Sequence, residues 1–245
     1  MITLRKYIRN LILEMAGDIS PGRKVIFMAG APGAGKSTVL KQLGLINQFE
    51  IVNPDDWYEP FLEEAGISLD IHTFTQKYFD IMSAIKAGKA EGLDVTELQS
   101  EREALRPTMS ENMKLFARAR KLAKEKASEL SSQGIDFIID GTGGNYKEIS
   151  KLNTVYKHMG YDTGMIYISV PKTTSIERNW QRGEKGKRRI HSDAAARSWD
   201  SVDKNLEPYK LLFGNSFFFV DNSSSFEDFQ ENIESIRSNM ETFLL

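Results

Sequence analysis

Short apolar runs alternate along the chain with longer segments in which apolar residues recur every three or four positions. Four apolar runs predict buried strands at about 25–29, 135–139, 165–170 and 217–220, and the pair Ile51-Val52 predicts a shorter fifth strand. The segments between these runs have helical periodicity. Strands that alternate with helices predict an α/β fold of three layers, in which helices cover both faces of a mainly parallel, five-stranded sheet.

The longest helical region, at about 59–132, lies between the second and third strands and is expected to be a helical insertion. Apolar residues at helical spacing over 74–85 mark one amphipathic helix within it. Pro107 breaks the periodicity, so a second long helix is expected to cover only about 109–132. Other helices are expected at about 1–20, between the third and fourth strands up to 159, and at 173–182, 193–213 and beyond 222.

The composition limits the class of protein. With 245 residues, of which 40% are apolar and 27% are charged, the chain is long enough for one α/β domain, and we expect residues 1–245 to form a single domain. The formal net charge of −2 does not predict a broad basic surface for nucleic acid. The absence of cysteine excludes disulfides and thiolate metal sites and fits a reducing cytoplasm, and no apolar run is long enough to predict a membrane span.

The residues directly after the first strand fit a phosphate-binding pattern. Residues 30–38 match G-x-x-x-x-G-K-S/T at every fixed position, between a predicted strand and a predicted helix. The backbone N–H groups of such a loop hold phosphate oxygens, Lys36 is expected to reach the β- and γ-phosphates, and Ser37 is expected to offer its hydroxyl to Mg²⁺. The predicted nucleotide-binding residues are Gly30, Ala31, Pro32, Gly33, Ala34, Gly35, Lys36, Ser37 and Thr38.

Two further polar segments follow predicted strands, and in open α/β sheets ligands bind at the carboxyl ends of the strands. Asp55 and Asp56 follow the second strand, where a carboxylate suits the orientation and deprotonation of a hydroxyl acceptor. Helix capping is the alternative role for both residues. Asp140 and Thr142 follow the third strand, where Asp140 suits a contact with the acceptor or an outer-shell contact with Mg²⁺. Turn formation is the alternative there.

The densest positive cluster of the chain follows the fourth strand. Arg178 and Arg182 are four residues apart and share one face of a predicted helix. The basic, glycine-bearing segment 183–190 has the composition of a lid that closes over a triphosphate and neutralises charge during its transfer. A solvated positive surface and a nucleic-acid patch are the alternatives. The candidate arginines are Arg178, Arg182, Arg188 and Arg189.

Together these motifs resemble the zeta-toxin group of P-loop kinases and, more loosely, the phage polynucleotide 5′-kinase domain. The likeness covers about residues 24–190, and its motifs are the phosphate loop, Val52-Asn-Pro-Asp55, the segment 134–143, Val170-Pro-Lys172 and Ile176-Glu-Arg178. It implies that Asp55 is the catalytic base and Lys36 the phosphate-binding lysine. It also implies that Arg178 and one of Arg188 and Arg189 contact the transferred phosphate, and that Asp140 and Thr142 lie on the acceptor side.

The resemblance leaves the acceptor open. Zeta toxins phosphorylate a UDP-linked amino sugar, but here Lys124 stands where they have an acidic sugar contact, and Leu152 replaces a hydroxyl residue. Tyr58 stands where the polynucleotide kinase has an arginine. We therefore expect an ATP- and Mg²⁺-dependent kinase that phosphorylates a hydroxyl of a small-molecule or nucleotide-type acceptor. A polynucleotide 5′-hydroxyl kinase and an ATP-hydrolysing switch protein are the alternatives, and a toxin-like protein held by an inhibitory protein partner is a third hypothesis.

Overall fold

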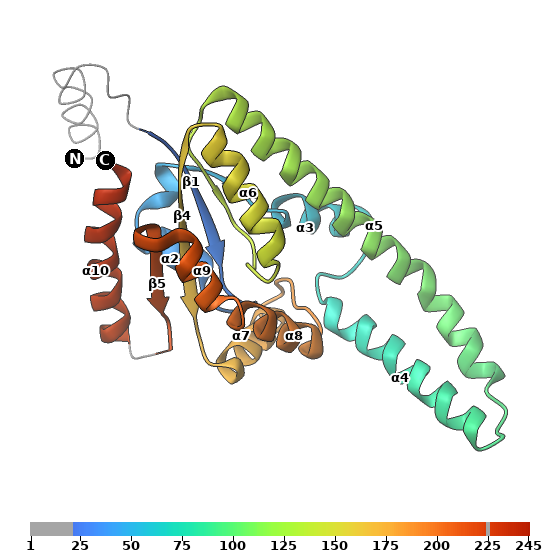
Figure 1. Cartoon of the computed structure of the whole chain (residues 1–245). Coiled ribbons are helices and arrows are strands. Elements are labelled where there is room, and N and C mark those ends of the chain that lie inside the picture. Colours follow the sequence, from blue (N-terminus) through green and yellow to red (C-terminus); the bar gives the residue numbers. More distant parts are fainter. Residues whose placement is uncertain (1–21, 224–225) are drawn as a thin grey trace.

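A parallel five-stranded sheet forms the centre of the protein in the computed structural model, which describes residues 22–223 and 226–245 (Figure 1). The strand order is β2-β3-β1-β4-β5, and every neighbouring pair is parallel. The strands are β1 Arg23–Ala29, β2 Glu50–Val52, β3 Phe137–Ile139, β4 Tyr161–Ser169 and β5 Phe217–Asp221. The predicted fold class is therefore confirmed. The helix expected at 1–20 lies outside the described residues.

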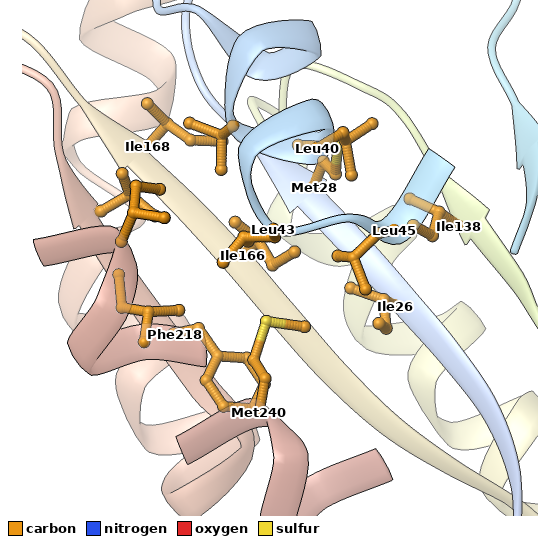
Figure 2. Close-up of a cluster of buried hydrophobic side chains, with 14 of the residues drawn as sticks. Ile26, Met28, Leu40, Leu43, Leu45, Ile138, Ile166, Ile168, Phe218 and Met240 are labelled. Atoms are coloured by element: carbon orange, nitrogen blue, oxygen red, sulfur yellow. The ribbon is translucent and has the colours of Figure 1, made fainter. Parts of the chain in front are cut away.

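Helices cover both faces of the sheet, which explains why β1 is a continuous apolar run. Ile26 and Met28 pack against α2 (Lys36–Gln42) and α10 (Phe226–Leu244) on one face, where Leu40 and Met240 lie (Figure 2). Val25, Phe27 and Ala29 pack on the opposite face. That face is covered by the C-terminal part of α5 (Thr96–Gln133), by α6 (Tyr146–His158) and by α9 (Leu206–Phe213).

β4 begins at Tyr161, four residues before the predicted start. The polar Asp162 and Thr163 hide this part of the strand in the sequence pattern, but their backbone pairs with β1. The remaining elements are α3 Asp55–Glu64, α4 Ile71–Ala90, α7 Lys172–Glu184, α8 Ser192–Asp203 and the 3-10 turns η1 Leu45–Asn47 and η2 Gly214–Ser216. Within residues 22–223 and 226–245, no helix has the length and apolar character that a membrane-spanning segment requires.

The predicted insertion is a helical hairpin. α4 and residues 96–114 of α5, which we call the arm, extend away from the sheet (Figure 1). Ile81 and Ile85 of α4 pack against Val95 near the tip of the arm. At its base, Tyr58 and Leu62 of α3 pack with residues of α4 and α5, so one small core joins α3 to the arm.

The expected break at Pro107 is wrong, since α5 runs through this residue without interruption. A proline inside a helix costs about 3 kcal/mol because it lacks an N–H group and its ring crowds the preceding turn. Pro107 is exposed, so water can reach the carbonyl that the proline leaves without a donor. Leu105 packs at the tip of the arm and Leu115 at its base, and this burial on both sides of Pro107 holds the helix together.

The single helix expected at about 193–213 is also wrong, because the structure divides it into α8 and α9. Pro208 lies in the first turn of α9, where its missing N–H group cannot continue a helix from α8. The break places Asn205 between the two helices. Its side chain is buried and donates hydrogen bonds to the carbonyls of Gly143 and Gly144, both at 3.1 Å. Asn205 therefore holds the loop that follows β3.

Asn205→Ala is expected to lower the free energy of unfolding by about 1 kcal/mol, because the Gly144 carbonyl loses its donor in a partly buried setting. Urea denaturation followed by circular dichroism measures the change. Asn215→Ala, at an exposed position, is the matched control and should change the stability by less than about 0.5 kcal/mol. Equal stability of Asn205→Ala and the parent protein would contradict this role.

Candidate active site

The phosphate loop occupies the turn between β1 and α2, as its sequence predicts. Gly33 and Gly35 have φ angles of 80° and 90°, in the left-handed region that favours glycine. A Cβ atom at Gly33 would lie 2.6 Å from the carbonyl oxygen of Ser175, so the absence of a side chain also lets α7 approach the loop. Ser37 is exposed at the start of α2, where its hydroxyl is open to a ligand.

Three distant segments hold the phosphate loop in place. Ser175 Oγ of α7 donates to the Pro32 carbonyl at 2.6 Å, and Asn222 Nδ2, directly after β5, donates to the Ala34 carbonyl at 2.8 Å. The backbone N–H of Gly30 donates to the carbonyl of Thr142 at 2.9 Å. Ser175 and Asn222 are not among the site residues predicted from the sequence. Only the position of Asn222 at the carboxyl end of a predicted strand could have indicated it.

Lys36 lies in a cluster of charged groups at the carboxyl edge of the sheet. Its Nζ donates to the Gly30 carbonyl at 3.0 Å. Burial lowers the pKa of the Lys36 ammonium, and the carboxylates of Asp140 and Asp55 partly oppose this shift. The nearby charges of Arg182 and Arg188 lower the same pKa further. The charges of predicted site residues therefore interact across several segments of the chain, namely the phosphate loop, the residues after β2 and β3, and the stretch from α7 to the lid.

Asp140 is 6% exposed and has one carboxylate oxygen without a partner. Its Oδ2 accepts a hydrogen bond from Asn53 Nδ2 at 2.9 Å, whereas Oδ1 is buried with no hydrogen bond. Burial raises the pKa of Asp140, and the charge of Lys36 opposes the shift. A buried carboxylate oxygen without a hydrogen bond is a favourable position for a cation or for a hydrogen-bond donor of a ligand.

These residues fit a magnesium ion. Mg²⁺ prefers oxygen ligands and in nucleotide sites is held by one or two protein groups, by phosphates and by water. The exposed Ser37 hydroxyl and Asp140 Oδ1, which has no hydrogen bond, are oxygen ligands of that type. No group of three or more acidic, histidine or cysteine side chains that could hold a metal ion occurs in the described part of the chain.

Asp55 begins α3, and its carboxylate is paired with Arg188 of the lid. Arg188 Nη2 donates to Asp55 Oδ2, and Arg188 Nε donates to Glu59 Oε1 at 3.3 Å. Asn53 Oδ1 accepts from the backbone N–H of Asp55 at 2.9 Å, so Asn53 makes the turn that begins the helix. The carboxylate of Asp55 makes no capping bond and faces the lid instead.

The four candidate arginines have different surroundings. Arg178 Nη2 donates to the Asn222 carbonyl at 3.4 Å, close to the phosphate loop. Arg182 lies near enough to Lys36 and Asp140 to shift the pKa of both. Arg189 is 9% exposed and forms a two-pronged ion pair with Asp70, at 2.9 and 2.5 Å. The structure thus places Arg178, Arg182 and Arg188 at the loop and the charged cluster, and Arg189 on the arm side of the lid.

The three positions at which the chain departs from the resembling families make contacts between helices. The Tyr58 hydroxyl hydrogen-bonds to Asn112 of α5, and burial raises the pKa of Tyr58 to about 12. The Arg188 guanidinium also lies over the Tyr58 ring, 5.7 Å from its centroid. Lys124 of α5 pairs with Glu148 of α6 at 2.7 Å, and Leu152 packs against the core of the sheet.

Comparisons with known proteins agree with this architecture. The model of the AAA domain family matches residues 25–209, which is most of the chain. A candidate kinase of Chloroflexus aurantiacus is similar over 91% of this chain and 98% of its own, with 14% identity and a TM-score of 0.50, which shows a shared P-loop kinase-like fold. None of the curated proteins compared with the chain matches it.

Two other solved structures are similar at lower scores. One is from the PezAT chromosomal toxin-antitoxin system of Streptococcus pneumoniae, with 18% identity over 98% of this chain and 95% of that one and a TM-score of 0.48. The other is a gluconokinase of Sinorhizobium meliloti, with 12% identity over 91% and 95% of the two chains and a TM-score of 0.45.

Asp140→Asn is expected to raise the melting temperature of the nucleotide-free protein at pH 7. Burial raises the pKa of Asp140 in the folded state, so the ionised carboxylate destabilises the fold above that pKa, and a neutral amide removes this cost. The gain should disappear below about pH 4, where the carboxyl group is protonated in both the folded and unfolded states. Thermal unfolding followed by circular dichroism between about pH 3 and 8 measures the difference.

The exposed Asp203→Asn is the control for this experiment and should leave the melting temperature nearly unchanged at each pH. A lower melting temperature of Asp140→Asn at pH 7 would show that the ionised carboxylate stabilises the fold and would contradict the prediction.

Proposed function

We propose that this chain, which belongs to the AAA domain family, is an ATP-dependent phosphotransferase that moves the γ-phosphoryl group to a hydroxyl of its acceptor. The observation that carries the proposal is the position of Asp55. Asp55 begins α3, shortly after the end of β2, and its carboxylate interacts electrostatically with the lysine of the phosphate loop and is paired with an arginine of the lid. A carboxylate next to the phosphates is the group that phosphoryl transfer to an alcohol requires, because it orients the hydroxyl and accepts its proton.

The phosphate loop forms the nucleotide side of the proposed site. Its backbone N–H groups hold the phosphates, and Lys36 exchanges the Gly30 carbonyl for the β- and γ-phosphates. Ser37 would hold Mg²⁺ directly and Asp140 through water, and the ion would neutralise part of the charge of the phosphates. Burial favours this exchange, since a phosphate is a stronger partner for an enclosed ammonium than a neutral carbonyl.

The acceptor side is formed by Asp55, Asp140 and Thr142. The acceptor hydroxyl gives its proton to Asp55 as its oxygen bonds to the γ-phosphorus, while the bond from phosphorus to the β–γ bridging oxygen breaks and ADP leaves. Asp55 must first lose its partner Arg188. The guanidinium can make the same two-pronged contact with phosphate oxygens that it makes with carboxylates. Arg188 would therefore leave the base as it stabilises the transferred phosphate.

The other arginines divide between two roles. Arg178 and Arg182 lie on α7 near the phosphate loop and would neutralise the charge that develops during transfer. Arg188 is assigned as the lid arginine that contacts the transferred phosphate, because Arg189 is already occupied by Asp70. The resemblance to zeta toxins favours a small-molecule or nucleotide-type acceptor, with a polynucleotide 5′-hydroxyl as the second candidate.

Asp55→Asn and Lys36→Ala are each expected to lower phosphoryl transfer by about 100-fold or more in a folded protein. Asp55→Asn removes the base but leaves the phosphate loop intact, so its affinity for MgATP should be retained, whereas Lys36→Ala should weaken it. The measurement uses ATP labelled on the γ-phosphate with panels of nucleotide sugars, nucleosides and 5′-hydroxyl oligonucleotides, and the labelled products are separated.

Asp56→Asn is the matched control, because it removes the exposed neighbouring carboxylate and should retain activity. Full activity of Asp55→Asn would exclude Asp55 as the base. Label that appears only as free phosphate, with every acceptor, would replace the kinase by an ATP-hydrolysing protein. Label on the oligonucleotides alone would identify a polynucleotide kinase.

A further inference from the structure

The lid is joined to the base of the arm through the backbone. The N–H of Arg189 donates to the Leu69 carbonyl at 3.1 Å, and the N–H of His72 donates to the Arg189 carbonyl at 3.1 Å. Asp70 and Arg189 form a parallel β-bridge at this point. The end of the lid is therefore paired with the residues that lead into α4, and the two segments share one short piece of sheet-like structure.

The two neighbouring arginines of the lid point to different partners because side chains alternate along extended backbone. Arg188 pairs with Asp55 and Glu59 on α3. Arg189 pairs with Asp70, before α4. A displacement of Arg189 would therefore displace Arg188 as well, since one peptide unit separates them.

The Arg189 side chain is enclosed on several sides. Its guanidinium lies 4.1 Å from the centroid of the Trp180 ring, and both of its paired bonds reach Asp70. A Cβ atom at Gly183 would lie 2.6 Å from Arg189 Cδ, so the side chain crosses α7 where that helix has only a glycine. The pairing with Arg189 lowers the pKa of Asp70, which keeps the carboxylate ionised in the neutral range. Arg189 is thus held in place and is not available to a phosphate.

We propose that Asp70 and Arg189 form a clamp that positions Arg188 for phosphoryl transfer. Both are positioning residues, which act on the reaction through Arg188 and do not contact the substrates. This inference rests on the proposed function, and it gives Arg189 a different role from the phosphate contact that its sequence suggests. Because α3 and the arm share the core around Tyr58 and Leu62, the clamp also fixes Arg188 relative to Asp55 at the start of α3.

A double-mutant cycle tests the clamp. Asp70→Asn keeps the size of the side chain and removes its charge, and it should lower kcat about tenfold with little change in KM for the acceptor. Arg188→Ala should lower kcat by at least as much. The double variant should be no slower than Arg188→Ala, because Asp70 has no further effect once Arg188 is absent. Asp70→Glu, which can still pair with Arg189, should recover part of the lost activity.

Losses that multiply in the double variant would show that Asp70 acts independently of Arg188, and the clamp would be rejected. Wild-type kcat in Asp70→Asn would reject it as well. Glu101→Gln is the matched control, since it removes an ion pair with Lys77 that is exposed on the arm. This control should retain wild-type kcat.

Limited trypsin digestion of the full chain without nucleotide gives a second measurement, which does not depend on activity. Lid cleavage, after Arg188 or Arg189, requires local opening of the backbone pairing of Arg189 with Leu69 and His72. Asp70→Asn should raise the rate of lid cleavage several-fold, whereas Glu101→Gln should not. An unchanged rate in Asp70→Asn would reject the clamp. If the wild-type protein phosphorylates no acceptor, the proposed function fails, and the digestion still decides whether the clamp exists.

Discussion

Charged side chains at the carboxyl edge of the sheet lie in surroundings that water reaches poorly, and this enclosure requires each of them to have a partner. Lys36 has the Gly30 carbonyl, and Arg188 has Asp55 and Glu59. Within this cluster, in the described part of the chain, Oδ1 of Asp140 is the one fully buried polar atom that lacks a hydrogen bond. Without a ligand, the site therefore contains cationic side chains that can pair with an anion and one carboxylate oxygen that can pair with a cation. The electrostatics of the cluster therefore suit a ligand that brings both negative and positive charge.

The residues of the phosphate loop are contiguous in the sequence, but the contacts that hold the loop in place come from other parts of the chain. The glycines at 33 and 35 permit the left-handed turns, and this property belongs to the residues themselves. The loop is held in place by Ser175, Asn222 and the carbonyl of Thr142, which come from three other parts of the chain. The parallel sheet brings these parts together, because the carboxyl ends of β1, β3 and β5 lie along one edge.

This difference explains how much the sequence can predict. The strands were predictable because β1 and β4 are buried on both faces and therefore have continuous apolar runs. Whether a helix continues or ends at Pro107 and Pro208 could not be predicted from the sequence. The outcome depends on the exposure of each proline to solvent and on the packing of the residues on either side of it. The positive charge of residues 183–190 can be seen directly in the sequence. The division of labour between its two adjacent arginines depends on Asp55 and Asp70, which are more than a hundred residues earlier in the chain.

The residues at which this chain departs from the families it resembles also have a physical reason. Tyr58 joins α3 to α5 through Asn112, and Lys124 joins α5 to α6 through Glu148. Both contacts hold the long α5 helix, and with it the arm, against the rest of the protein. Tyr58 and Lys124 thus take part in the packing between helices, at positions that the sequence alone associates with the acceptor.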